Sequence, residues 1–280
     1  MFFFIIKFVG EDMRITIVGC GSRGTKLAEA ADKMMEVKRI YLLDEDRKRA
    51  EEVAGSINKA EIIDDIDEEL YHCDLVIECA TQAAAKMIIP KVVARGVDIM
   101  VMSVGALVDD EFRQSITEKA AQCDCKVYIP SGAICGTDGL RSSTVGEVQE
   151  VELVTIMPPV SFEDIQYVVD KGIDLKSIKE KTVLFTGTAR EAVQLFPRNV
   201  NVAAIVSIMG IGFDRTKVTI AADPTTKLNA HELRIKGEFG ELYTHTHNVP
   251  SQINPRTSNL AVFSAISALE RIVKNQWIGI

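Results

Sequence analysis

The fold of this chain is decided by one stretch of sequence, Arg14-Ile15-Thr16-Ile17-Val18-Gly19-Cys20-Gly21-Ser22-Arg23-Gly24. A short apolar run leads into a G-x-G-x-x-G turn, and a helical pattern follows directly. In such a turn the first glycine permits the tight bend, the second lets the backbone approach a pyrophosphate, and the third lets helix and strand pack closely. N–H groups at the helix start favour phosphate. The stretch therefore predicts a dinucleotide site made by Gly19, Gly21, Ser22, Arg23 and Gly24.

An acidic residue at the expected distance supports this site. Asp44 ends the next apolar run, 20 residues beyond Gly24. Its carboxylate would accept hydrogen bonds from the adenosine ribose hydroxyls and repel a 2′-phosphate, which favours NAD over NADP. Two alternatives stay open, because Asp44 could instead cap the following helix, and Arg47 leaves NADP possible.

The rest of the N-terminal half repeats the alternation of strand and helix. Short, nearly continuous apolar runs separated by helical patterns predict a parallel sheet covered on both faces, and right-handed crossovers make it doubly wound. The expected strands are 15–18, 40–43, 75–77, 99–102 and 127–129, and the expected helices are 22–35, 45–54, 82–95 and 109–122.

Small residues follow two of these strands. Cys79 and Ala80 come after the run 75–77, and Ser103–Ala106 come after 99–102. Ligands bind outside the carboxyl ends of the strands in such sheets, so we expect backbone contact with the nicotinamide half of the cofactor there. The alternative is that these residues are small only because the turns are tight.

After Pro130 the pattern changes to longer strands with fewer helices, which predicts a second, α+β domain. The expected strands are 148–156, 182–185, 217–221, 231–236 and 241–245, with helices at 188–195 and 200–209. Asn254-Pro255 is a good start for a last helix to about residue 274, whose apolar stripe would return it to the first domain. We therefore expect a dinucleotide-binding domain at 13–131 and 251–280, and a substrate-binding and dimerisation domain at 132–250.

Composition excludes several classes of function. The 280 residues carry a formal net charge of −8, and the sequence pI is about 5.2, which argues against nucleic acid as a partner. The apolar N-terminal residues 1–9 are too short to span a bilayer, so no membrane association is expected. Six cysteines form no C-x-x-C pair, which favours a reducing, cytoplasmic location and no metal site.

Histidines and arginines offer candidates for the chemistry. His231 follows an Asp-Pro turn at the start of a strand, and its ordinary pKa near ~6.5 would let it exchange protons at neutral pH. On spacing alone, the alternative that His231 is a structural histidine is favoured. His245 and His247 alternate along a strand and could be a metal pair or partly exposed strand residues. Arg198 or Arg256 could bind a substrate carboxylate, or form a surface or dimer salt bridge.

Motifs beyond residue 130 carry a resemblance to a known family. They are Pro130-Ser-Gly-Ala-Ile134, Leu195-Phe-Pro-Arg-Asn-Val-Asn-Val-Ala203, Ala222-Asp-Pro224, Asn229-Ala-His-Glu232, Asn248-Val-Pro-Ser251 and Asn254-Pro-Arg-Thr-Ser258. Together with the glycine-rich turn they resemble the L-aspartate dehydrogenase family from Arg14 to about Leu269.

The resemblance implies a homodimer of chains with a Rossmann domain and an α+β domain. It implies oxidation of L-aspartate by NAD(P)+ and water to oxaloacetate, ammonia and NAD(P)H through iminoaspartate. By position, His231 matches the catalytic histidine, and Ala133 and Asn201 match cofactor-contacting residues. The family usually has Gly-Gly where this chain has Cys135-Gly136, which bears on substrate specificity.

Two other functions remain possible on the sequence. One is a nicotinamide-dependent reductase of a different imino or oxo acid. The other is a nicotinamide-sensing protein without turnover, although a sensor needs no general base such as His231.

Overall fold

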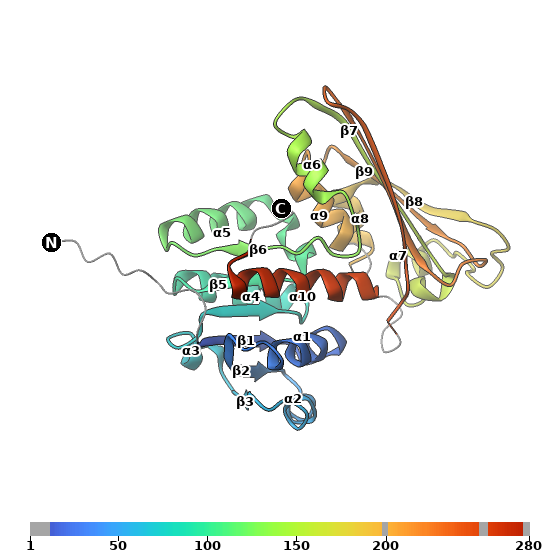
Figure 1. Cartoon of the computed structure of the whole chain (residues 1–280). Helices are drawn as coiled ribbons and strands as arrows, with labels where there is room; N and C mark the ends of the chain where they lie inside the picture. The colour runs from blue at the N-terminus through green and yellow to red at the C-terminus, as the bar shows by residue number, and fades with distance from the viewer. Residues whose placement is uncertain (1–11, 198–200, 252–256, 277–280) are drawn as a thin grey trace. The chain divides into compact units, whose positions relative to one another are not determined.

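The computed structural model describes residues 12–197, 201–251 and 257–276, which fall into two compact units (Figure 1). The first unit takes in the described parts of Met1–Ser103, Gln114–Pro130 and Ala265–Ile280, and the second takes in those of Val104–Arg113 and Ser131–Ser264. The boundaries expected from the sequence, at 131–132 and 250–251, separate a cofactor-binding domain from a substrate-binding domain, and this division of roles stays a prediction.

The first unit is built on a six-stranded, wholly parallel sheet in the order β3-β2-β1-β4-β5-β6. This is the Rossmann order, with its topological switch between β1 and β4. The strands are β1 (Met13–Val18), β2 (Val37–Leu43), β3 (Ala60–Ile62), β4 (Leu75–Glu78), β5 (Asp98–Val101) and β6 (Val127–Tyr128). The predicted doubly wound α/β fold is confirmed, and β3 is the one strand of this sheet that was not expected.

Helices supply the apolar surfaces that cover this sheet. One core cluster joins Ile15 and Ile17 of β1 to Leu27 of α1 and to Leu269 and Val273 of α10, and all five side chains are buried. The helices are α1 (Ser22–Asp32), α2 (Arg47–Ala54), α3 (Ile66–Glu69), α4 (Gln82–Ala94), α5 (Asp110–Gln122) and α10 (Asn259–Lys274). The C-terminal helix therefore returns to the first unit, as predicted.

The start of α10 differs from the expectation. Asn254-Pro255 lies outside the described residues, but Thr257 and Ser258 are not helical, and α10 begins only at Asn259. Backbone bonds hold these residues extended instead, because the Ser251 N–H donates to the Thr257 carbonyl at 2.7 Å and Ser258 forms a bridge with Pro250. The predicted helix start was therefore wrong by several residues.

The second unit is built on a mixed five-stranded sheet in the order β11-β10-β7-β9-β8. Only β7 and β9 run parallel. All five predicted strands are confirmed, as β7 (Val148–Met157), β8 (Thr182–Thr188), β9 (Thr216–Ala222), β10 (Asn229–Gly237) and β11 (Gly240–Asn248). The predicted α+β character of this part is confirmed with them.

Seven short helical segments accompany this sheet or its connections. They are η1 (Val104–Val108), α6 (Thr137–Ser143), η2 (Pro159–Phe162), α7 (Gln166–Asp170), α8 (Ala189–Leu195) and α9 (Asn201–Met209), together with the first turn of α5. Only α8, α9 and α5 were predicted. The segments η1, η2 and α7 have four or five residues, too few for a hydrophobic period to be recognised, whereas α6 was missed although it is as long as α8.

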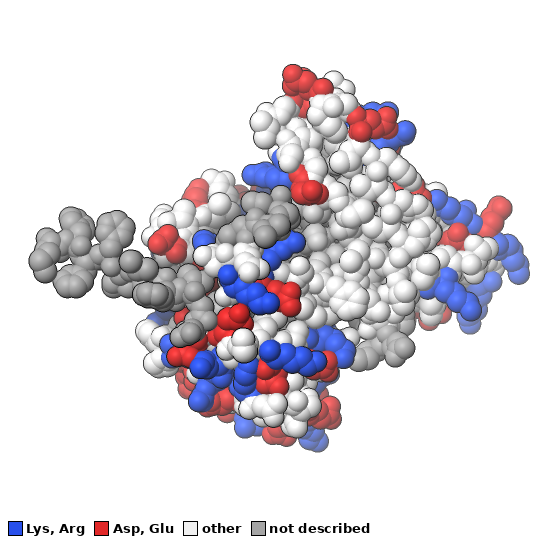
Figure 2. Space-filling view, viewed as in Figure 1, with Lys and Arg blue, Asp and Glu red and all other residues white. Residues whose placement is uncertain are grey.

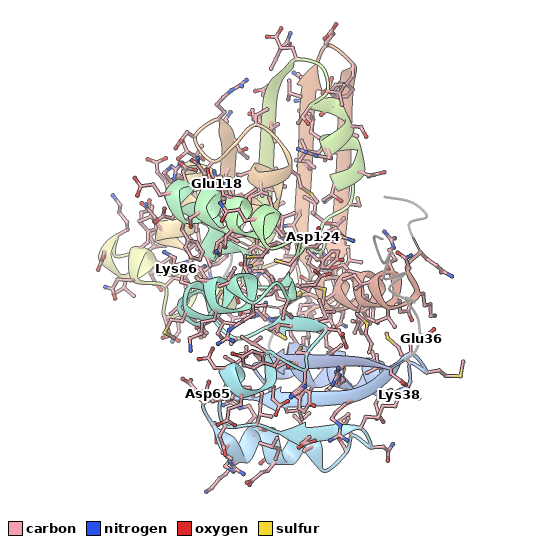
Figure 3. The ribbon with its side chains drawn as sticks, turned by 90° about the vertical axis from the view of Figure 1, so that its left-hand side faces the viewer. Glu36, Lys38, Asp65, Lys86, Glu118 and Asp124 are labelled. Carbon is pink, nitrogen blue, oxygen red and sulfur yellow. The ribbon has the colours of Figure 1, made fainter. Side chains whose placement is uncertain are left out.

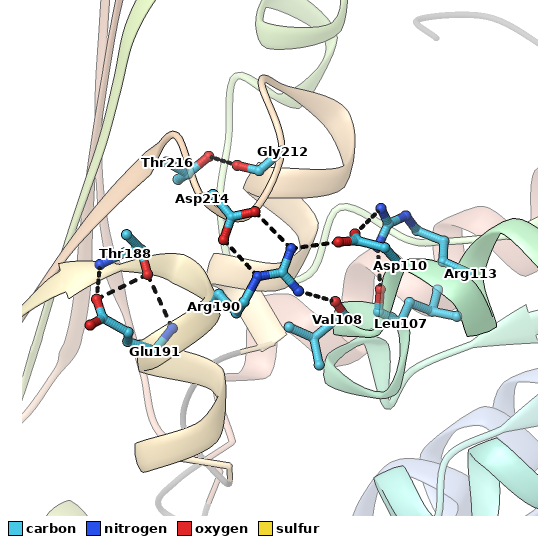
Figure 4. Close-up of polar contacts among 10 residues, drawn as sticks. All are labelled: Leu107, Val108, Asp110, Arg113, Thr188, Arg190, Glu191, Gly212, Asp214 and Thr216. Atoms are coloured by element: carbon cyan, nitrogen blue, oxygen red, sulfur yellow. Dashed lines mark hydrogen bonds and ion pairs between the residues drawn. The ribbon is translucent and has the colours of Figure 1, made fainter.

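Hydrogen bonds and ion pairs of one arginine connect the segment 104–113 to the rest of this unit (Figure 4). Arg190 of α8 grips Asp214 with two bonds of 2.6 and 2.8 Å, donates to Asp110 at 2.7 Å, and donates to the Val108 carbonyl at 2.9 Å. Paired bonds of this kind are both strong and directional. They give η1 and the start of α5 a fixed place among the elements of the second unit.

Charged side chains lie mainly on the surface. Lys38, Asp65, Lys86 and Glu118 of the first unit are all exposed (Figure 3). On the face shown in Figure 2, basic and acidic side chains lie together over the first unit, and a broad area over the sheet of the second unit carries neither kind. Within the described part of the chain, no helix is long and apolar enough to cross a membrane.

Candidate active site

The glycine-rich turn has the conformation that its sequence requires. Gly19 adopts a φ of +95°, and a Cβ there would approach the Ala80 backbone to 2.8 Å. A Cβ on Gly24 would lie 1.9 Å from the Gly19 carbonyl oxygen, so only glycine lets α1 pack this closely on β1. Beside Gly21, in contrast, a Cβ would meet nothing within 4 Å among the described residues.

That open space lies where a diphosphate would bind. Gly21 is the N-cap of α1 and has no side chain to cap the helix, and Ser22 and Arg23 are the first residues of α1. These N–H groups and the helix dipole attract an anion. The turn therefore fits the diphosphate of a dinucleotide.

Asp44 is held against the same turn. Its Oδ2 accepts the Cys20 N–H at 2.7 Å and its Oδ1 accepts the Asp46 N–H at 2.9 Å, while its side chain is 5% exposed. The cap of α2 is Asp46, whose carboxylate accepts the Lys48 N–H. The alternative that Asp44 serves as the helix cap is therefore wrong.

The arginines next to Asp44 have partners of their own. Arg47 pairs with Glu51 and with Asp64, and Arg49 approaches Asp44 to 3.7 Å with half of its side chain exposed. A carboxylate has room for more than two donors, so Asp44 can still accept from ribose hydroxyls.

Cys79 and Ala80 follow β4 directly, at the carboxyl end of the sheet. Cys79 is buried, and Ala80 is partly exposed. Arg23 reaches them from α1, with its guanidinium 3.4 Å from both of their carbonyl oxygens. The first unit thus brings together all the cofactor residues predicted in it.

His231 occupies a buried position on β10 in the second unit. The residue is 1% exposed, and its Nδ1 lies 3.0 Å from Oγ1 of Thr155, which is its register partner on β7. Burial lowers the pKa of His231 to about 4, so the ring is neutral at neutral pH. A neutral ring with one nitrogen held by a hydroxyl can accept or donate a proton at the other.

Thr155 was not predicted. Its signal in the sequence is a hydroxyl on the otherwise apolar inward face of a strand, since Leu153 and Met157 lie on the same face. Buried hydroxyls need a partner, and His231 is the one that this strand pairing provides.

The two predicted cofactor residues of this unit, Ala133 and Asn201, both form hydrogen bonds to neighbouring segments. The Ala133 carbonyl accepts from the Asn248 amide at 2.9 Å and from the Thr246 hydroxyl at 3.4 Å. Asn201, at the start of α9, accepts the Gly105 N–H on its Oδ1 at 3.2 Å. Both residues are thus fixed by neighbours in the same unit.

The remaining histidines lie apart from His231. Because His231 pairs with Thr246 across β10 and β11, Thr246 shares its face, and His245 and His247 point to the opposite face of the sheet. Their rings lie 4.3 Å apart, as their alternation predicted. Among the described residues, no three His, Cys, Asp or Glu side chains gather in a way that could hold a metal ion. Arg198 and Arg256 lie outside the described residues.

Cys135, which departs from the family pattern, is exposed, and its carbonyl accepts from the Thr244 hydroxyl at 3.2 Å. All six cysteines are free.

Comparisons with known proteins cover both units. A family model described as "Aspartate dehydrogenase, C-terminal" matches residues 138–272, and one described as "Homoserine dehydrogenase, NAD binding domain" matches residues 19–130. The first unit is accordingly an NAD(P)-binding domain.

Whole-chain relatives point the same way. The L-aspartate dehydrogenase of Methanosarcina barkeri is 43% identical over 95% of this chain and 99% of its own length. That of Nitrosopumilus maritimus is 38% identical over 92% of this chain and 96% of its own. The crystal structure of aspartate dehydrogenase from Thermotoga maritima covers 96% of this chain and 99% of that one, with a TM-score of 0.71 and 28% identity.

Proposed function

The chain belongs to the L-aspartate dehydrogenase family, and we propose that it catalyses the NAD(P)-dependent oxidative deamination of L-aspartate to oxaloacetate and ammonia, and the reverse reaction. The observation that carries the proposal is its similarity to L-aspartate dehydrogenases over almost the whole chain. The glycine-rich turn and His231 each lie within a stretch matched by a dehydrogenase family model. The chemistry of the two units agrees with it.

The first unit would hold the nicotinamide cofactor, which when bound accepts a hydride from the amino acid. Gly21 and the first turn of α1 would face its diphosphate, and Asp44 its adenosine ribose. Because a carboxylate repels a 2′-phosphate, we propose that NAD is preferred over NADP. Cys79 and Ala80 would contact the nicotinamide half, with Ala133 and Asn201 as further contacts.

His231 would move the protons of the hydrolytic half of the reaction. Hydride loss from the free amine leaves an iminium ion, and water adds to its carbon and gives a proton to Nε2 of His231. The imidazolium returns that proton to the amino nitrogen of the carbinolamine. The C–N bond then breaks and ammonia leaves, while the hydroxyl group passes its proton to Nε2 as the carbonyl forms. For Nε2 to accept, the ring's own proton must lie on Nδ1, where Thr155 Oγ1 can accept it at 3.0 Å.

An absorbance assay for NADH with each of the twenty amino acids tests the proposal. We expect L-aspartate to give the highest kcat/KM. A different preferred amino acid would favour the reductase of another imino or oxo acid, with Cys135 as the first residue to examine. Tight NADH binding without turnover of any amino acid would favour a sensor.

The resemblance to the family also supports a homodimer in which residues 132–250 supply the substrate contacts and the dimer interface. Light scattering of the purified chain of 30.8 kDa tests this assembly. The six free thiols support a reducing, cytoplasmic location.

A further inference from the structure

A buried carboxylate closes the carboxyl ends of two neighbouring strands in the first unit. Glu78 is the last residue of β4 and is 0% exposed. Its Oε1 accepts the Ala80 N–H at 2.9 Å, and its Oε2 accepts the Ser103 N–H at 2.9 Å. Ala80 follows β4 and Ser103 follows β5, so one side chain joins the loops after both strands.

Arg23 binds the carbonyl oxygens of the same loops. From the first turn of α1, its guanidinium lies 3.4 Å from the Cys79 and Ala80 oxygens and 3.5 Å from the Met102 oxygen. The carboxylate of Glu78 therefore binds N–H groups of these loops, and the guanidinium of Arg23 binds their carbonyl groups. Such a hydrogen-bond network fixes the backbone conformation more closely than packing alone.

Burying a carboxylate costs free energy of folding, which indicates that Glu78 has a role other than stabilising the fold. Burial raises the pKa of Glu78, and the hydrogen bonds from Ser103 and the positive charge of Arg23 oppose that rise. Apolar residues of similar size commonly replace buried ion pairs without loss of stability. The parallel strand itself needs no charge here, because Leu75, Val76 and Ile77 before it are all apolar and buried.

The location of these loops in the sheet indicates which part of the cofactor they would contact. In the sheet order β3-β2-β1-β4-β5-β6, the two halves on either side of the switch each take one nucleotide of a dinucleotide. The glycine-rich turn and Asp44 belong to β1 and β2, which leaves β4 and β5 for the nicotinamide nucleotide. We propose that Glu78 is a positioning residue that shapes the loops after β4 and β5 to receive the nicotinamide half of the cofactor. This proposal rests on the proposed function.

Comparing two ligands separates positioning from folding. NADH and ADP-ribose share the adenosine, the diphosphate and a ribose, but only NADH carries nicotinamide. Glu78→Gln keeps the shape of the side chain, yet its amide can accept only one of the two N–H groups and turns a donor toward the other. We expect its affinity for NADH to fall by about tenfold or more, because a buried donor is left unpaired, and its affinity for ADP-ribose to change by less than about twofold.

Thr16→Val is the matched control. Thr16 is equally buried in the neighbouring strand, and its hydroxyl bonds Cys73, before β4 begins. This variant should change neither affinity. Equal losses of both ligands in Glu78→Gln, or no loss of either, would overturn the positioning role. Failure of the wild-type chain to bind either ligand would instead overturn the proposed function.

A second variant at the same position covers the case in which Glu78→Gln does not fold. Glu78→Asp keeps the charge but shortens the side chain by one methylene group, so its carboxylate cannot reach both the Ala80 and the Ser103 N–H groups. A selective loss of NADH affinity in Glu78→Asp supports the proposal, and an equal loss of both ligands contradicts it.

Discussion

Thr155 Oγ1 lies 3.0 Å from Nδ1 of His231. The two residues are register partners on the neighbouring strands β7 and β10. Both residues are almost fully buried, at 4% and 1% exposure. A hydrogen bond in such surroundings fixes the orientation of the ring, and it can also fix which nitrogen carries the proton.

We predict that Thr155→Val lowers kcat. Valine keeps the shape of threonine but leaves Nδ1 without a partner, so the ring loses the hydrogen bond that keeps Nε2 ready to accept, at a cost of about tenfold in rate. NADH affinity should stay unchanged, and Thr155→Ser should restore most of the activity. Equal kcat in Thr155→Val and the wild type would show that the hydroxyl has no part in orienting His231.

Removal of His231 itself should be more severe. His231→Asn should lower kcat by about 10²–10⁴-fold, since an amide can hydrogen-bond but cannot exchange protons. His245→Asn is the matched control, because His245 points to the other face of the sheet. The assignment is wrong if His231→Asn retains more than about a third of the wild-type kcat, a loss far below that range.

The cofactor preference should depend on Asp44. Asp44→Asn keeps an oxygen for the Cys20 N–H but removes the charge, so the ratio of kcat/KM with NAD to that with NADP should fall. Asp46→Ala is the comparison, because it removes the cap of α2 at a cost of about 1 kcal/mol and should leave this ratio unchanged. An unchanged ratio in Asp44→Asn would exclude Asp44 from ribose recognition.

The low pKa of His231 should make the protein sensitive to acid. Between its folded pKa of about 4 and the ordinary value near ~6.5, the unfolded chain binds a proton that the folded chain does not. The contribution of His231 to the free energy of unfolding is therefore fully present above pH ~6.5 and is lost as the pH drops toward 4. We expect a loss of roughly 2 kcal/mol between pH 7.5 and 5 from this residue alone.

Denaturant unfolding at several pH values measures this loss. His231→Asn should flatten the dependence, whereas His72→Gln, which changes an exposed histidine, should leave the slope as in the wild type. A wild-type stability that does not change between pH 7.5 and 5 would contradict the burial effect.

The thiols should differ sharply in reactivity. Burial raises the pKa of Cys20 to about 12 and that of Cys73 to about 11, and raises those of Cys79 and Cys125, whereas Cys135 is exposed. A thiol reagent should therefore label Cys135 first in the native protein, and Cys135→Ser should remove that rapid phase. The denatured chain should titrate six groups, and reductant should not change Tm. A count of four or fewer in a sample that has been neither reduced nor oxidised would indicate disulfides.

The sequence was enough for most of the fold, because period and glycine spacing are local properties. It did not predict β3, which has three residues with the polar Glu61 at their centre. It left open whether Asp44 caps the following helix, because the turn that places Asp46 at the cap instead is seen only in the structure.

The sequence predicted single candidate residues in both units, but not the partners that the fold brings to them. The glycine-rich turn and Asp44 come from one βαβ unit, so their spacing alone predicted a cofactor site. Thr155 and His231 lie 76 positions apart and meet only through the pairing of β7 with β10. Glu78 was missed because a charge at the end of an apolar strand commonly marks the strand's exit to solvent, and only the fold shows that it is buried.

The return of α10 to the first unit has a consequence for synthesis on the ribosome. Ala265, Leu269 and Val273 complete the core around Ile15 and Leu27, yet they are translated only after the whole of Ser131–Ser264. The nascent Rossmann domain must therefore wait with part of its apolar surface uncovered while the second unit is made. Chaperones that bind exposed apolar segments would have their main opportunity in that interval.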